Sequence, residues 1–169
     1  MKSKKVEESK VIISQLMQPE HANPGGIIHG GVVMKEIDNA AGAVAVKHGR
    51  KIAVTASIDR ISFHHMIFIG NLVSIKASIN KAWKSSMEIG VRVEAEDLLK
   101  GETRHVASAY LTFVALDENG KPSEIPQLEL VTEDEKRRAK EAENRKKIRL
   151  EVKETEKACQ DGSFKCNIS

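Results

Sequence analysis

Asn23-Pro-Gly-Gly-Ile-Ile-His-Gly-Gly-Val-Val-Met-Lys-Glu-Ile-Asp38 is the stretch on which the fold of this chain depends. Its four glycines and one proline predict a loop, and the small apolar residues that follow predict a helix over 32–48. On that helix Asp38 falls at the edge of the apolar face, beside Met34 and Ala41. A carboxylate in this position either turns to water or belongs to a site.

Strands are predicted on both sides of the helix. A β-rich run at 10–17 ends before Pro19, and after the helix the apolar period changes to two. Four further strands are expected at 54–59, 73–80, 87–96 and 106–116, with an antiparallel meander as the simplest pairing. The fold class is therefore α+β, with an antiparallel sheet of about five to six strands wrapped around one long central helix.

The alternation also predicts which side chains share a face of each strand. In the first strand after the helix, Val54, Ala56 and Ile58 are expected on one face, and Thr55 and Ser57 on the other. The apolar residues of the next two strands alternate in the same way. These apolar faces are expected to cover the helix.

The two ends of the chain differ in composition from this central part. Residues 1–9 are mostly charged and are expected to be disordered, and 10–130 are expected to form one domain. The polar stretch over 131–157 predicts a charged helix, either lying along a partner subunit or solvated, followed by a flexible tail at 158–169. The segment 133–157 carries +2 of the net charge of +3, which argues against nucleic acid as a partner.

Several other classes of protein are disfavoured by composition. No apolar run reaches the roughly 18 to 20 residues that span a bilayer, so no membrane insertion is expected. The first residues lack the apolar core of a signal peptide, and the only cysteines are Cys159 and Cys166. A cytoplasmic location follows as the expectation.

The glycine loop before a helix is by itself a candidate anion or oxyanion site. The first N–H groups of a helix lack intrahelical partners and carry the positive end of its dipole. The loop is not a P-loop, because no Gly-Lys-Ser/Thr follows, nor a dinucleotide fingerprint, because a meander is predicted after it. A glycine loop without a ligand is about equally compatible with the sequence.

Asp38 makes a site more plausible but cannot share it with Asn23 through sequence proximity alone. It lies about two helical turns beyond the loop, roughly 10 to 12 Å along the axis. The two side chains can meet only if the chain folds back or if a second subunit contributes one of them. A solvent-facing acid with no role in a site is the alternative for Asp38.

The chain resembles the hotdog-fold acyl-CoA thioesterases of the bacterial short-chain and brain-type acyl-CoA hydrolase group. The resemblance covers about residues 10–155 and includes a charged C-terminal helix. Its first motif comprises Asn23, Gly26, Gly30, Gly31 and Asp38. It continues through Val54-Thr-Ala-Ser-Ile-Asp59, Phe63, Gly70-Asn71, Lys84-Ser-Ser-Met87, Leu111-Thr-Phe-Val-Ala-Leu-Asp117 and Gly120-Lys-Pro122.

The resemblance implies a homodimer whose sheets join edge to edge, usually assembled into a hexamer with active sites at the dimer interface. It implies that Asp38 is the general base or the nucleophile and that Asn23 positions the water or the thioester carbonyl. The N–H groups of Gly30 and Gly31 are suited to the negative oxygen that develops during attack on a thioester. Thr55 is a candidate supporting hydroxyl, with a strand-filling threonine equally plausible.

The resemblance also suggests where coenzyme A binds. Lys84, Ser85 and Ser86 occupy a turn where the family often has Arg-Thr/Ser-Ser, and lysine supplies a point charge in place of the bidentate fork. Arg60 and Arg104 are weaker candidates for the phosphates, and any of the five is also compatible with an ordinary surface role. No metal and no redox cofactor are expected, since coenzyme A is part of the substrate.

Two histidine positions depart from the family pattern. His29 stands where this group commonly has phenylalanine, so it is expected either to contact the thioester oxygen or, as we favour, to fill the aromatic position. His64 and His65 replace a stretch that more usually contains proline, and adjacent strand residues point to opposite faces, which disfavours a shared metal.

Hydrolysis of acyl-CoA to free acid and coenzyme A is the leading hypothesis. A hydroxyacyl-thioester dehydratase on the same fold is weaker, because those enzymes match the motifs poorly. A non-hydrolytic acyl-CoA-binding regulator is the alternative from another class. The sequence does not predict the preferred acyl chain length.

Overall fold

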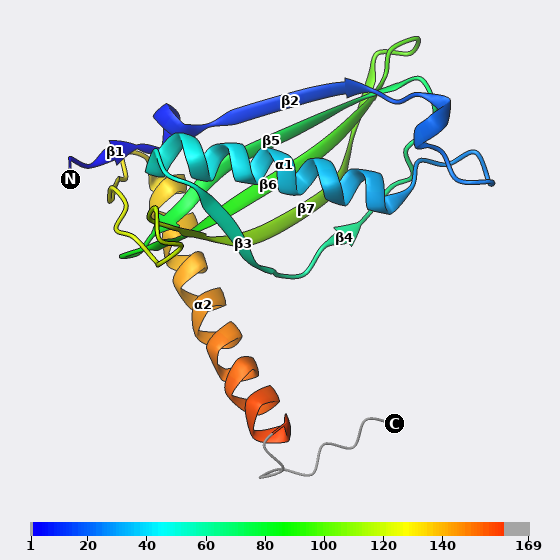
Figure 1. The fold of residues 1–169 in the computed structure, drawn as a ribbon. Helices are drawn as coiled ribbons and strands as arrows, with labels where there is room; N and C mark the ends of the chain where they lie inside the picture. Colours follow the sequence, from blue (N-terminus) through cyan, green and yellow to red (C-terminus); the bar gives the residue numbers. More distant parts are fainter. Residues whose placement is uncertain (1, 161–169) are drawn as a thin grey trace.

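The computed structural model describes residues 2–160, which form a curved antiparallel sheet with one helix on each face (Figure 1). The long helices are α1 (Gly30–Gly49) and α2 (Glu133–Gln160), and two short 3-10 helices are η1 (Val6–Ser9) and η2 (Pro19–His21). The strands are β1 (Lys4–Lys5), β2 (Val11–Leu16), β3 (Ala53–Ile58), β4 (Ser62–Phe63), β5 (Asn71–Ala82), β6 (Ser86–Asp97), β7 (Glu102–Ala115) and β8 (Leu128–Glu129).

The main sheet has the order β2-β5-β6-β7-β3, with β4 also paired to β7. The predicted meander is confirmed for β5, β6 and β7 but is wrong for β3, which pairs with β7 and leaves the position beside β5 to β2. The reason is geometric. Helix α1 connects β2 to β3 and crosses the face of the sheet, so β2 and β3 lie at opposite edges. β3 thus becomes an edge strand of this protomer.

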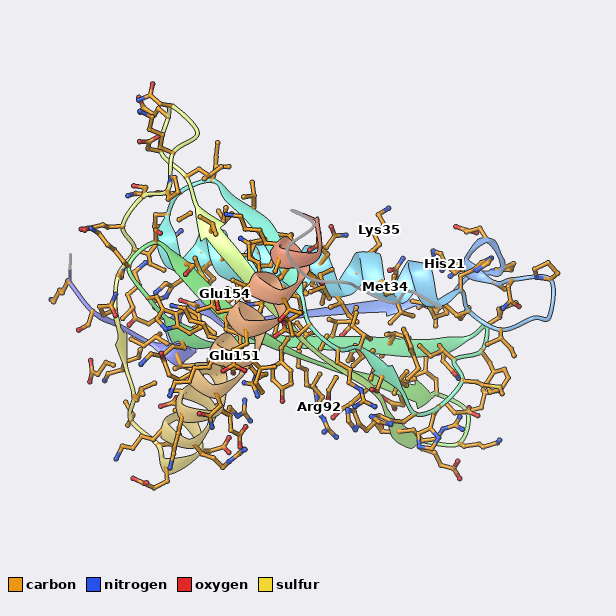
Figure 2. All side chains as sticks on the ribbon, turned by 90° about the horizontal axis from the view of Figure 1, so that it is seen from below. His21, Met34, Lys35, Arg92, Glu151 and Glu154 are labelled. Carbon is orange, nitrogen blue, oxygen red and sulfur yellow. The ribbon has the colours of Figure 1, made fainter. Side chains whose placement is uncertain are left out.

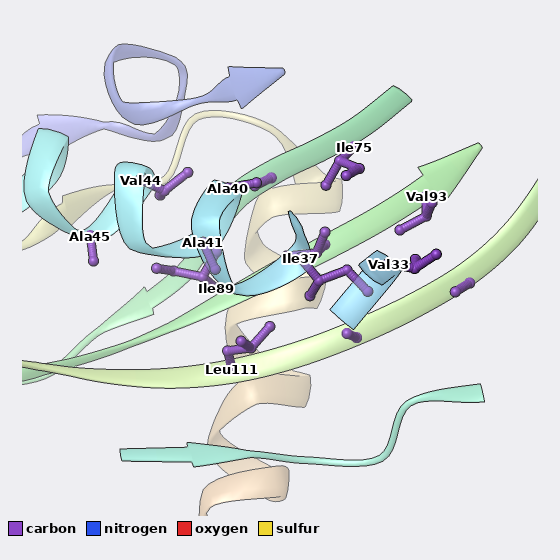
Figure 3. Packing of buried hydrophobic residues seen from close by; sticks show 14 of the residues in the cluster. Val33, Ile37, Ala40, Ala41, Val44, Ala45, Ile75, Ile89, Val93 and Leu111 are labelled. Carbon is purple, nitrogen blue, oxygen red and sulfur yellow. The ribbon is translucent and has the colours of Figure 1, made fainter. Parts of the chain in front are cut away.

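The concave face of the sheet packs on α1 and forms the core (Figure 3). Ile37, Ala41 and Val44 of α1 are fully buried, as are Ile89 and Leu111 of the facing strands. Alanine and valine at the contact let the helix approach the sheet closely, which a curved sheet around a single helix requires. The predicted helix and the inward faces of β5 and β6 are confirmed.

The opposite face of the sheet is covered by the first half of α2, whose Ala139 and Ala142 are buried. Arg145 reaches the fully buried carboxylate of Glu88 on β6, with 2.7 Å between Nη2 and Oε1, and its guanidinium lies 3.7 Å from the centre of the Tyr110 ring. The part of α2 around Arg145 therefore packs on its own protomer. It is not solvated on all sides, and its packing does not depend on a partner subunit. α2 ends at Gln160 instead of 157, and the rest of the predicted 158–169 tail lies outside the described residues.

Residues 4–9 are ordered, which contradicts the disorder predicted for 1–9 over this part of the segment. β1 pairs in parallel with β8, and Val6 and Ser9 of η1 are buried. Ser9 Oγ lies 3.0 Å from Nδ1 of the buried His48, while Lys4 Nζ donates to the His48 carbonyl oxygen at 2.7 Å. The prediction failed because Lys4 and Ser9 contact His48, close to the C-terminal end of α1. Local composition does not reveal a tertiary contact of this kind.

His48 predicts how stability depends on pH. Its Nε2 donates to the Pro126 carbonyl oxygen at 2.8 Å, and in the neutral ring Nδ1 is then the acceptor for the Ser9 hydroxyl at 3.0 Å. Burial lowers the pKa of His48 below its ordinary value of about 6.5. The unfolded chain therefore binds more protons near that pH, and the stability that the neutral ring contributes is lost as pH falls below about 6.5.

We expect the melting temperature to fall between pH 7.5 and 5.5, and the fall to be smaller in His48→Gln. A surface variant, His65→Gln, serves as the matched control because His65 is exposed. Scanning calorimetry of the three proteins at equal concentration gives the comparison. An equal pH dependence in the parent protein and His48→Gln would contradict the assignment.

Candidate active site

The glycine loop is shaped by the side chain of Asn23. Its Oδ1 accepts hydrogen bonds from the backbone N–H groups of Gly25 at 2.9 Å and Ile27 at 3.3 Å. Gly26 adopts a φ of 76°, a conformation that glycine tolerates and most residues do not. Since Oδ1 is used within the loop, the amide NH₂ of Asn23 is the part that remains to contact a ligand.

The loop leads directly into the N-terminus of α1. The His29 carbonyl oxygen accepts from the N–H groups of Val32 at 3.0 Å and Val33 at 3.3 Å, which starts the helix. Among the described residues, the N–H groups of Gly30 and Gly31 have no acceptor. These two donors, at the positive end of the helix dipole, are available to an anion.

Neither glycine at the helix start is required by packing within the protomer. A Cβ at Gly31 would have nothing within 4 Å, and one at Gly30 would be 3.7 Å from the Phe63 ring, an ordinary contact. Neither residue has a positive φ. Because Gly30 and Gly31 have no side chains, a ligand can approach their backbone N–H groups closely.

Asp38 and Thr55 are brought together by a bulge in β3. Thr55 Oγ1 donates to Asp38 Oδ1 at 2.8 Å. The pairing of β3 with β7 shifts between Thr55 and Ser57, so the alternation changes phase at Ala56. The predicted face of Val54, Ala56 and Ile58 is therefore wrong, because Thr55 points to the helix and the half-exposed Val54 to the other side.

The Asp38–Thr55 pair opens onto the edge of the protomer. Asp38 is half-buried and Thr55 is exposed, and the exposed apolar side chains of Met34, Ile52 and Ile58 lie on the same elements or beside them. Met34, labelled in Figure 2, lies one helical turn before Asp38. An edge strand with exposed apolar side chains is a surface suited to pairing with another chain.

Asn23 and Asp38 make no contact with each other within residues 2–160 of one protomer. Eight residues of helix separate Gly30 from Asp38, about 12 Å along the axis. The donors at the helix start and the carboxylate are thus too far apart to act on the same atom in one copy of the chain. The completion of the site by a second copy of the chain stays a prediction.

A cavity of about 420 Å³ lies on the outer face near α2 and is lined mainly by charged and polar side chains. A more apolar cavity of about 340 Å³ lies beside Gly30. The second is lined by Phe63, His65, Met66 and other residues of the segment that follows β3. Phe63 and Met66 are strongly exposed for apolar side chains, at 46% and 60%. The sequence singled out Phe63 and His65 but gave no sign that they line a cavity next to the helix start.

The candidates for phosphate contacts are divided between the two ends of the sheet. Lys84, Ser85 and Ser86 form the β5–β6 turn, and Ser86 pairs with Val114 of β7, which pairs in turn with Val54 of β3. Two strand spacings, about 10 Å, therefore separate this turn from the region of Thr55. Lys84 is 82% exposed and lies 3.5 Å from Glu124.

The other candidates lie elsewhere. Arg104 is near the opposite end of β7, where it pairs with Ala95, and Arg60 is exposed in the connection between β3 and β4. His29 is exposed, and its imidazole makes no hydrogen bond to the rest of the described chain. It does not fill an aromatic position within the protomer. The rings of His64 and His105 lie 5.3 Å apart between centroids.

Residues 2–160 contain neither a cluster of metal ligands nor a helix suited to span a membrane. No group of three or more His, Cys, Asp or Glu side chains there is arranged to hold a metal ion. Neither helix of this part of the chain has the length and apolar character needed to cross a bilayer. The cytoplasmic location and the lack of a cofactor stay predictions.

Known proteins resemble the chain in sequence and in fold. Residues 25–102 match the thioesterase superfamily. The acyl-CoA thioester hydrolase YkhA of Bacillus subtilis, described as uncharacterized, is 37% identical over 83% of this chain and 86% of its own length. The cytosolic acyl coenzyme A thioester hydrolase of Mus musculus is 39% identical over 83% of this chain, which spans only 37% of that protein.

Solved structures give the same result. An apo-hexameric acyl-CoA thioesterase superposes with a TM-score of 0.87 at 38% identity, covering 90% of this chain and 97% of its own. An acyl-CoA hydrolase from Staphylococcus aureus, solved with butyryl coenzyme A and coenzyme A, superposes with a TM-score of 0.83 at 33% identity, covering 94% and 99%. The chain therefore belongs to the hotdog-fold acyl-CoA thioester hydrolases of the thioesterase superfamily.

Proposed function

We propose that this protein hydrolyses acyl-CoA to a free carboxylic acid and coenzyme A, with Asp38 as the group that activates water or attacks the thioester. The observation that carries the proposal is the 2.8 Å hydrogen bond from Thr55 to Asp38 beside an edge strand, in a chain of this family. The bond fixes one carboxylate oxygen and leaves the other free to accept a proton from water.

We propose a separate task for the N-terminus of α1. Attack on a thioester carbonyl places negative charge on its oxygen, and the unpaired N–H groups of Gly30 and Gly31 are donors already fixed in position. The NH₂ of Asn23, at the beginning of the glycine loop, is a further candidate donor. In the general-base route, Asp38 of the partner copy takes a proton from water as the water attacks, and the proton passes to the thiolate of coenzyme A when the C–S bond breaks. In the nucleophilic route, the Asp38 carboxylate displaces the thiolate, and water then hydrolyses the resulting mixed anhydride to the free acid and supplies the proton for the thiolate.

Variants of the Staphylococcus aureus enzyme support the assignment of Asn23, Asp38 and Thr55. Three of its structures carry alanine in place of one asparagine, one aspartate and one threonine. In that enzyme the asparagine precedes the aspartate by 15 residues and the threonine follows it by 17. Asn23, Asp38 and Thr55 have the same spacings.

The assembly we propose is a homodimer formed through the β3 edge, with hexamers of three dimers. Its support is the separation of Asn23 from Asp38, the exposed apolar residues near β3, and two similar proteins described as hexameric. Coenzyme A is proposed to lie along Lys84, Ser85 and Ser86, the candidates that share an end of the sheet with Thr55.

A thiol-release assay with acyl-CoAs from acetyl to palmitoyl tests the proposed function. We expect turnover on at least one chain length, with no added metal or redox cofactor, because the reaction needs only a base and an oxyanion site. If none of the substrates is hydrolysed by the intact assembly while coenzyme A esters still bind, the non-hydrolytic regulator becomes the better hypothesis.

A further inference from the structure

The residue just before the proposed coenzyme A turn is held by α2. Trp83 Nε1 donates to Glu143 Oε2 at 3.1 Å, and the ammonium of Lys146 lies 4.2 Å from the centre of the same ring. The Trp83 carbonyl oxygen accepts from Gln127 Nε2 at 3.0 Å. Three separate contacts therefore fix one side chain and its peptide group at the base of the turn.

The strand that leaves the turn is held by the same part of α2. Glu88, two residues after Ser86, has a fully buried carboxylate that accepts from Arg145 Nε and Nη2 and from Asn80 Nδ2. Glu143, Arg145 and Lys146 lie within one helical turn of each other. A single turn of α2 thus contacts the chain on both sides of Lys84, Ser85 and Ser86.

The turn itself shows why such support matters. Its backbone is paired, with Trp83 N donating to the Ser86 carbonyl oxygen at 2.8 Å and Ala115 N to that of Ser85 at 2.9 Å. The Lys84 side chain, in contrast, is 82% exposed and has only a weak contact with Glu124. A long exposed lysine binds a phosphate well only if the base from which it extends stays in place.

We propose that α2 is a positioning element for the coenzyme A site, in which Glu143 and Lys146 act through Trp83 to hold the β5–β6 turn against the ligand. The proposal rests on the proposed function, because it assigns the turn to coenzyme A. Glu143, Lys146 and Trp83 are positioning residues and do not take part in the chemical step. A purely structural α2 would change stability without changing affinity for coenzyme A.

The test compares four variants of the full-length protein. Glu143→Ala removes the acceptor for Trp83, whereas Glu143→Gln keeps an acceptor oxygen and should rescue the effect. Lys146→Met keeps the aliphatic contact with the ring and removes the charge, and Lys147→Met is its control because Lys147 is exposed and next to it in the chain. Circular dichroism and sedimentation velocity must show the same fold and assembly for all.

We expect KM for acyl-CoA to rise about fivefold in Glu143→Ala and in Lys146→Met at unchanged kcat. The factor should be the same for short and long acyl chains, and the inhibition constant of free coenzyme A should rise in parallel. Glu143→Gln and Lys147→Met should match the parent protein. Equal KM values in Glu143→Ala, Lys146→Met and the parent would overturn the proposal.

The fluorescence of Trp83 separates this inference from the proposed function, because it is the only tryptophan of the chain. Titration with coenzyme A should change the emission of the parent protein, with a weaker apparent affinity in Glu143→Ala. If coenzyme A changes the emission of the parent protein, with a weaker affinity in Glu143→Ala, but no ester is hydrolysed, the proposed function is wrong and the positioning role is still supported. A parent that hydrolyses esters with no emission change on binding would count against the role of Trp83.

Discussion

Asp38→Asn is expected to lower kcat/KM for acyl-CoA by about two to four orders of magnitude without unfolding the protein. The substitution keeps the size of the side chain. It also keeps an oxygen that can accept the hydrogen bond that Thr55 Oγ1 donates to Asp38 Oδ1 at 2.8 Å in the parent protein. It removes the capacity to take a proton or to attack as a carboxylate, which is the contribution usually made by a general base. Steady-state thiol release measures the loss.

Glu36→Gln is the matched control for this prediction. Glu36 is also an acid of α1 and stands two residues before Asp38, but its carboxylate is only in contact with Asn39, at 3.4 Å. Its activity should stay within about twofold of the parent protein, as is usual for a surface change away from a site. If Asp38→Asn were as active as Glu36→Gln, the proposed mechanism would fail while the family assignment remained.

The same substitution tests whether the site is shared between two chains. Mixing inactive Asp38→Asn with inactive Asn23→Ala under conditions of subunit exchange should restore about a quarter of the parent activity, because half of the dimers are mixed and each mixed dimer holds one intact site. Sedimentation of differently tagged chains verifies the exchange. Verified exchange with no recovery would place Asn23 and Asp38 in a site formed by one chain.

The sequence predicted the parts of this fold that depend on local periodicity. The central helix and the inward faces of β5 and β6 follow from apolar spacing alone. The position of β3 at the sheet edge did not follow, because it depends on α1 crossing the sheet. The order of residues 4–9 also escaped prediction, since Ser9 and Lys4 are held by contacts with His48, almost forty residues or more away.

For the candidate site, the sequence predicted which residues belong to it but not how they are oriented. The family pattern named Asp38 and Thr55, but alternation alone placed Thr55 on the wrong face relative to the helix. The bulge at Ala56 reverses the alternation, so that Thr55 faces α1. No residue type in the strand indicates a bulge at this position. The contacts of Trp83 with Glu143 and Lys146 were not anticipated either, because both residues come from a segment that is polar on all sides.

Arg145→Leu is expected to destabilise the protein by about 3 to 5 kcal/mol, the usual result of leaving a buried charge without its partner. The Glu88 carboxylate has no exposed surface and would keep only the hydrogen bond from Asn80 Nδ2, at 3.1 Å. For a chain of this size the melting temperature should fall by about 6 to 20 °C. Calorimetry at a fixed protein concentration measures it, because assembly also affects stability.

Two comparisons show whether the buried charge is the cause. The double variant Glu88→Gln/Arg145→Leu removes both charges and should recover much of the loss, whereas a simple loss of packing would persist. Arg149→Leu breaks a less buried pair, that of Arg149 with Asp59 at 2.8 Å, and should cost less. A penalty that is the same in the double variant as in Arg145→Leu would mean that α2 is held mainly by its apolar contacts through Ala139 and Ala142.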